Sequence, residues 1–190
     1  MSSIKLSPNA SGTGEFTIAA PNSNTNRTLT LPDNTGTVLT TGSTGQVIPK
    51  AALPTGSVLQ VVNATYSTYV STGSTSYVDT GLSATITPSS VASKVLIFAN
   101  VPDAHNNVTA SILYLNVVRN STQIIEFAKH SDHLGSGASL VTYGGSTSYL
   151  DSPNTTSATT YKVQFKVNSG SQALFLNNGV GTITLMEIAA

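Results

Sequence analysis

The stretch Tyr161-Lys162-Val163-Gln164-Phe165-Lys166-Val167 decides the fold class of this chain. Its side chains alternate, so that one face of the segment is apolar while lysine and glutamine occupy the other. A period of two residues is typical of a β-strand with one buried face. No window of about a dozen residues places apolar side chains at the helical period. The sequence therefore predicts an all-β protein.

Short β-branched and aromatic runs, bounded by turn residues, recur from residue 58 onward. The predicted strands cover residues 58–65, 75–87, 94–101, 111–119, 123–129, 138–143, 160–168, 173–177 and 182–188. Turns are predicted at residues 71–74, 106–107 and 177–179, where Ser, Thr, Gly and Asn cluster. Eight or nine strands over about 130 residues favour an antiparallel β-sandwich of jelly-roll type.

Two of the predicted strands are apolar on both faces. They contain Leu96-Ile97-Phe98 and Ile112-Leu113-Tyr114-Leu115. We expect such strands to lie centrally in a sheet or at a contact between subunits.

Residues 12–42 form a separate first unit with three short predicted strands. Its apolar side chains are Phe16, Ile18, Leu29, Leu31, Val38 and Leu39. A piece of about 30 residues is below the roughly 40-residue limit for unaided folding, because it buries too little surface to offset its ordering entropy. Its strand pattern is nevertheless too regular for a disordered tail. We therefore expect several copies of the chain to associate, each contributing one apolar face to a shared core.

The predicted organisation has three parts. Residues 1–45 are an N-terminal β segment. Residues 46–57 are a linker, which Pro49 and Pro54 stiffen. Residues 58–190 are the β-sandwich.

Composition excludes several classes of function. Charged residues make up 8% of the 190 residues, against roughly 25% in ordinary domains. The eight basic residues are scattered singly, so the clusters that bind nucleic acid or a membrane surface are lacking. The chain has no cysteine, which excludes disulfides and thiolate sites. No segment resembles a signal peptide or a membrane span, so we expect synthesis in a cytoplasm.

His130, Asp132 and His133 form the one local cluster of possible metal ligands. Along the axis of a trimer, one imidazole from each chain could hold a divalent ion. The alternative is a polar loop between strands, followed by Gly135-Ser136-Gly137, and this interpretation is favoured. His105 with Asp103 has the same two interpretations and a weaker case. We predict no metal and no cofactor.

No sequence motif indicates a catalytic centre. The nucleophile elbow Gly-X-Ser-X-Gly is missing, although a Ser-His-Asp site could assemble from remote positions. Paired carboxylates for glycoside cleavage could come only from eight scattered acids. Gly144-Gly145 and Gly12-Thr13-Gly14 precede no lysine and helix start, so they are predicted turns rather than phosphate loops. We therefore predict a protein that is not an enzyme.

The seven tyrosines could include a platform for sugar binding, because aromatic faces stack on sugar rings. Tyrosine is also a favoured strand and interface residue. Those in or beside predicted loops are the better binding candidates: Tyr66, Tyr69, Tyr143 and Tyr149. Those predicted to serve packing are Tyr77, Tyr114 and Tyr161.

The segment GEFTIAAPNSNTNRTLTLPDNTGTVLTTGS, residues 14–43, resembles a short repeat of tail-fibre and related virion proteins of bacteriophages. The matching features are the Phe-Thr-Ile strand, the Pro-Asn turn, the Asn-Arg-Thr-Leu-Thr-Leu-Pro run and the closing Thr-Gly-Thr-Val. A looser similarity covers residues 87–97, 152–165 and 185–188. Tail fibres are often longer than this chain, which suggests a short fibre, a fibre tip, or a projection on the capsid or neck.

The resemblance implies a virion fibre or appendage protein, commonly a homotrimer, that is assembled in the host cytoplasm. Its N-terminal segment, residues 1–45, would be a fibre-like β segment that serves for attachment by contacting other virion structural proteins. The displayed C-terminal domain would have a host-surface glycan or protein as its candidate partner. Two alternatives stay open: a capsid or neck decoration protein that stabilises the particle, and a virion-associated glycan-degrading enzyme.

Overall fold

A computed structural model describes residues 11–13, 22–26, 28, 50–106, 111–131, 142–169, 173–175 and 179–190. The chain divides into two units, residues 1–46 and 47–190. The strands predicted within residues 12–42 lie almost wholly outside the described residues. The fibre-like segment, its need for several copies, and the limits of the linker and sandwich therefore stay predictions.

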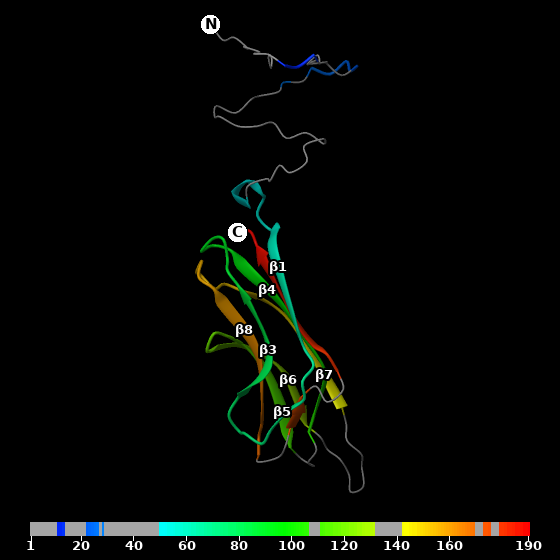
Figure 1. Cartoon of the computed structure of the whole chain (residues 1–190), viewed down its shortest axis with the longest axis vertical. Helices are drawn as coiled ribbons and strands as arrows, with labels where there is room; N and C mark the ends of the chain where they lie inside the picture. Colours follow the sequence, from blue (N-terminus) through cyan, green and yellow to red (C-terminus); the bar gives the residue numbers. More distant parts are fainter. Residues whose placement is uncertain are drawn as a thin grey trace. The chain divides into compact units, whose positions relative to one another are not determined.

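The second unit consists of two antiparallel sheets that pack face to face (Figure 1). A short 3-10 turn, η1 (Lys50–Ala52), precedes them. Sheet A contains β1 (Val58–Tyr66), β2 (Val70–Thr72), β4 (Lys94–Asn106), β7 (Thr142–Asp151), β9 (Ala173–Phe175) and β10 (Gly181–Ile188). Sheet B contains β3 (Val78–Ile86), β5 (Ile112–Arg119), β6 (Thr122–Ser131) and β8 (Thr159–Val167). The described part of the chain has no helix that is long and apolar enough to cross a membrane.

Strands that are distant in sequence lie side by side in both sheets. Sheet A has the order β1-β10-β4-β9-β2, with β7 also paired to β4. Sheet B has the order β3-β8-β5-β6. This arrangement confirms the predicted all-β, antiparallel sandwich of jelly-roll type. The two strands that are apolar on both faces, β4 and β5, are central as predicted, since each is paired on both sides.

The core lies between the sheets and is formed by alternate residues of each strand. Tyr161, Val163, Phe165 and Val167 of β8 are fully buried, while Lys162, Gln164 and Lys166 between them are partly exposed. This confirms the alternation predicted for that segment. On sheet A, the inward residues of β4 are Val95, Ile97, Ala99 and Val101, which are also buried.

The structure corrects two predicted turns. Gly144 and Gly145 lie within β7, which runs ten residues to Asp151 instead of ending near residue 143. A Cβ on Gly145 would lie 3.1–3.2 Å from side chains of Leu115, Phe127 and Ala128, so close packing explains this glycine. Of the turn predicted at 71–74, the first two residues, Ser71 and Thr72, belong to β2. The turn predicted at 106–107 stays a prediction, because Asn106 is the last residue of β4 and Asn107 lies outside the described residues.

Candidate functional site: two unlike outer faces

The outward residues of sheet A form an apolar row that crosses four strands. In the antiparallel register, Val61 of β1 lies beside Met186 of β10, Met186 beside Leu96 of β4, and Leu96 beside Leu150 of β7. We call these four residues the apolar band. All four alternate with inward core residues, so their side chains lie on the solvent face. A solvated sheet face normally carries polar side chains at such positions.

The apolar band is open to solvent at its two ends. Val61 is 56% exposed and Leu150 is 54% exposed, and Phe98 in the next row of β4 is 44% exposed. A shallow hollow of about 390 Å³ lies beside the band. It is lined in part by Phe98, Asn100, Ser146, Ser148 and Thr182.

Sheet A is nearly uncharged around the band. Apart from the band, Phe98 and Asn100, the outward side chains in the described rows that cross β4 between Lys94 and Asn100 are Val58, Asn63, Thr65, Thr182, Thr184, Ser146, Ser148 and Ile188. Lys94, at the end of these rows, is the one charged side chain among them, and its Nζ donates to Ser152 Oγ at 2.9 Å. This face can therefore lose its water at little electrostatic cost.

The outer face of sheet B has the opposite chemistry, because it collects charged and aromatic side chains. Lys162 Nζ and Gln164 Nε2 both donate to the Asp79 carboxylate at 2.7 Å. Partial burial acts to raise the pKa of Asp79, but these hydrogen bonds outweigh it and lower that pKa.

An aromatic and cationic cluster lies in a neighbouring row of sheet B. Lys166 Nζ lies 4.4 Å from the ring centre of Tyr77 and 4.9 Å from that of Tyr114. Lys129 Nζ, from the neighbouring strand β6, lies 5.5 Å from the centre of the Tyr114 ring. Tyr77 donates its hydroxyl to Glu126 Oε2 at 2.6 Å, and burial followed by this bond raises the pKa of Tyr77. Cation–π contacts of this kind stabilise neighbouring strands modestly.

Neighbouring side chains cover part of the outer face of sheet B, over its central strand β5. Asn116 and Val118 of β5 point outward, yet they are only 1% and 3% exposed. Asn116 Nδ2 donates to Gln123 Oε1 at 2.9 Å, and Lys162 is the register partner of Val118. Long polar side chains thus shield the middle of sheet B, as amphipathic stems commonly do.

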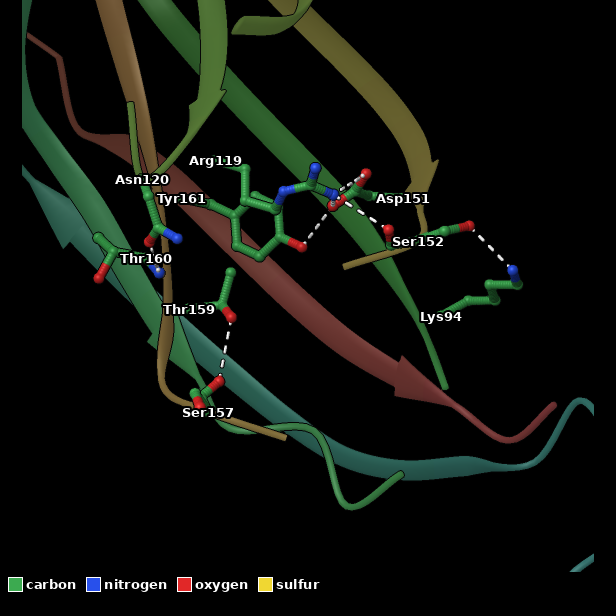
Figure 2. A network of polar contacts seen from close by, with 9 residues as sticks. All are labelled: Lys94, Arg119, Asn120, Asp151, Ser152, Ser157, Thr159, Thr160 and Tyr161. Atoms are coloured by element: carbon green, nitrogen blue, oxygen red, sulfur yellow. Dashed lines mark hydrogen bonds and ion pairs between the residues drawn. The ribbon is translucent and has the colours of Figure 1, made fainter. Parts of the chain in front are cut away.

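A polar clasp joins the two sheets near one end of the sandwich (Figure 2). Arg119 of β5 donates through one guanidinium nitrogen to both carboxylate oxygens of Asp151 of β7, at 2.9 and 2.8 Å. Tyr161 of β8 donates its hydroxyl to the same carboxylate at 2.7 Å. Burial, and then this bond to Asp151, raises the pKa of Tyr161. The clasp fixes sheet A against sheet B.

A buried carboxylate holds the end of the sandwich where the chain enters β1. Glu187 accepts hydrogen bonds from Gln60 Nε2, from the backbone and hydroxyl of Ser89, and from Ser93 Oγ, at 2.6–2.8 Å. Lys50 Nζ lies 3.8 Å away. Burial acts to raise the pKa of Glu187, but the hydrogen bonds prevail and lower it to about 2.

The metal-ligand candidates lie largely outside the described part of the chain. His130 belongs to β6 and His105 to β4, each with its side chain undescribed. Asp132 and His133 lie beyond the described residues. Among the residues that are described, no group of three or more His, Cys, Asp or Glu could hold a metal ion. The predicted absence of a metal stays a prediction.

The tyrosines divide differently from the prediction. Tyr161 is buried packing, as predicted. Tyr66 packs against the core and over Gly81, which favours packing over binding. Tyr69 and Tyr149 remain accessible, at 47% and 36% exposed. Tyr143 lies in β7 with its side chain undescribed.

Sequence reasoning missed the apolar band and the cluster around Lys166. The outward positions of Leu96 and Phe98 left a signal, since they lie in a strand that is apolar on both faces. The partners of Leu96 in the band, Met186 and Leu150, could be identified only from the strand order.

The sequence matches no protein-family model, and no curated protein matches it. Among solved structures, the chain is similar to the VP2 subviral particle of infectious bursal disease virus, with 14% identity and a TM-score of 0.36. That match covers 70% of this chain and 38% of the viral chain. A second match is to T=1 particles derived from the same virus, with 14% identity, a TM-score of 0.40, and coverage of 76% and 40%. The chain thus spans about two fifths of those proteins, and at these TM-scores the likeness shows no shared family or function.

Proposed function

We propose that this chain is a structural protein of a virus particle, namely a homotrimeric fibre or appendage of a bacteriophage. The observation that carries the proposal is the contrast between a nearly uncharged outer face with an open apolar band on sheet A and a charged outer face on sheet B, whose central strand is covered. Apolar surface that stays open on a rigid domain is typical of a component of a larger assembly. The N-terminal repeat at residues 14–43, similar to that of tail-fibre proteins, supports the assignment to a phage.

In this proposal the sandwich is a displayed domain that contacts a host surface. The charged face of sheet B suits exposure to water, and the accessible rings of Tyr69 and Tyr149 offer stacking surfaces for a glycan. Three copies on one rigid body would combine weak sites through effective concentration. Binding therefore requires only a modest affinity at each site.

The proposal includes no catalytic role. The buried ionisable groups Asp151, Tyr161 and Glu187 are each engaged in hydrogen bonds that hold the sandwich together. Incubation of the purified protein with host polysaccharide tests this part. We expect no reducing ends to be released; their release would support the glycan-degrading alternative.

Immunolabelling of intact particles tests the assignment to the virion. An antibody against residues 58–190 should label a fibre or other projection of the phage that encodes the chain. Uniform labelling of the head or neck, without binding of the purified protein to host cells, would favour a decoration protein. Particles that carry no label and contain no copy of the chain by mass spectrometry would contradict the virion assignment.

A further inference from the structure

We infer that the apolar band on sheet A is a contact surface between copies of this chain. The inference rests on the proposed homotrimer and assigns to it a defined interface: Val61, Met186, Leu96 and Leu150, together with Phe98 in the next row.

The apolar side chains of the band form a continuous row across sheet A. A single exposed apolar residue on a sheet is ordinary. Here the register aligns one apolar side chain from each of four neighbouring strands into one row. Phe98 widens the row, so the face presents a continuous patch rather than isolated side chains. A patch of this kind marks an interaction surface.

The two sheets of the domain differ in how far their outward apolar residues are covered by neighbouring side chains. On sheet B, the outward residue Val118 is 3% exposed because its neighbours cover it. On sheet A, the central band residues Leu96 and Met186 are partly exposed, and Val61 and Leu150, which lie on edge strands, are more than half exposed. The row neighbours of Phe98, Thr184 and Ser148, are too short to reach over it. The described part of the chain thus leaves the band open to a partner.

The charge and composition of the face indicate which partner it suits. Lys94 is the one charged side chain in the described rows of this face, so a strongly acidic or basic partner gains little there. A surface made of apolar, hydroxyl and amide groups suits a partner of the same composition, and this chain is only 8% charged. The sequence also predicts that residues 12–42 need further copies of this chain to complete a core. The occupant is thus a second copy.

The face supplies part of the area that such an assembly needs. Four strands spaced by about 4.8 Å, over about 25 Å of strand length, give about 500 Å² on each copy. In a ring of three each copy divides this face between two neighbours, so each contact buries about 500 Å², about half of the roughly 1,000 Å² of a specific interface. Residues 12–42 are predicted to supply further contact area. A closed ring of three needs unlike surfaces to meet. The band and the adjoining hollow at Phe98, Ser146 and Thr182 are two unlike surfaces on one face.

Thiol reactivity in the full chain tests the inference directly, because the chain has no cysteine of its own. Three single variants are needed: Val61→Cys and Leu150→Cys in the band, and Ser83→Cys on the outer face of sheet B as the matched control. All three positions are exposed within one chain, so the substitutions leave the fold intact. The rate of maleimide labelling is measured in buffer and divided by the rate for the same variant in denaturant.

We expect the two band thiols to react about tenfold or more slowly than the control thiol, because they become accessible only when copies separate. If the molar mass were that of several chains and all three thiols were labelled at the same rate, the interface would be overturned. The homotrimer would still stand. Equal slowing at all three positions would also overturn it, since the cover would not be specific to sheet A. A single-chain mass would overturn both the homotrimer and the interface.

Discussion

Gly81 occupies a position in β3 that tolerates no side chain. Its φ of +94° lies in the region that glycine favours, and the ring of Tyr66 lies where a Cβ would be. We expect Gly81→Ala to lower the free energy of unfolding by about 2 kcal/mol or more, through backbone strain and displacement of the ring. Urea unfolding followed by circular dichroism measures this change.

Gly56 provides the matched control for Gly81. Its φ is +89°, but no atom lies within 4 Å of a Cβ built there. Gly56→Ala should therefore cost about 1 kcal/mol, from the backbone alone. An equal decrease in the free energy of unfolding for the two variants would show that the contact with Tyr66 does not add to the cost at Gly81.

Glu187 makes the stability of the sandwich depend on acid pH. Its pKa is lowered from 4.5 to about 2 in the folded state. The resulting stabilisation is fully present above pH 4.5 and is lost as the pH falls through 2, because the unfolded carboxyl binds its proton first. It amounts to about 3 kcal/mol.

The variant Glu187→Gln removes that titration. We expect it to be less stable than the wild type at pH 7, and to lose less stability between pH 5 and about pH 2. Unfolding by urea at several pH values measures both effects. Parallel stability curves for wild type and variant would contradict the lowered pKa.

At the scale of elements, the clasp shows how remote strands are joined. Arg119→Met would leave the Asp151 carboxylate buried with its charge unpaired, and we expect a loss of about 3 kcal/mol in the free energy of unfolding. Tyr161→Phe removes one hydrogen bond to that carboxylate and should cost about 1–2 kcal/mol. Both losses are measured by urea unfolding.

The ion pair of Lys162 and Asp79 is the control for the clasp, since the Asp79 side chain is 50% exposed. Lys162→Met should change the free energy of unfolding by less than about 1 kcal/mol. If Arg119→Met changed the free energy of unfolding by as little as Lys162→Met, the clasp would not hold the sheets together.

The strands themselves were largely predictable, because alternation is a local property. β8 could be identified directly from residues 161–167. β7 could not, since Gly144, Gly145 and the following Ser and Thr residues have the composition of a loop. Their strand conformation depends on pairing with β4 and on close packing against Leu115 and Ala128, neither of which is a local property.

The candidate surfaces were less predictable than the strands. Each arises from residues that only the strand order brings together, such as Lys162 with Asp79, 83 positions apart, and Leu96 with Leu150. The sequence indicated that β4 was central or at a subunit contact. It could not indicate which of its side chains point outward or what lies next to them.

At the scale of the whole molecule, the band predicts how assembly responds to charge. In Leu96→Lys the new ammonium group lies at the centre of the band and points outward, so the fold persists while the contact between copies loses its apolar surface. Residues 12–42 are predicted to hold copies together as well, so we expect the mass in solution to fall toward that of one chain at a higher protein concentration than in the wild type. Ser83→Lys on sheet B is the control and should leave this concentration dependence unchanged. The same concentration dependence for Leu96→Lys and the wild type would contradict the role of the band.

The molar mass of the full wild-type chain tests association itself, on which the fibre, the interface and multivalent binding all depend. Multi-angle light scattering at micromolar concentration gives this mass without reference to shape. We expect three times the 19.5 kDa of a single chain. A mass of 19.5 kDa that stays constant as the concentration rises would contradict the homotrimer.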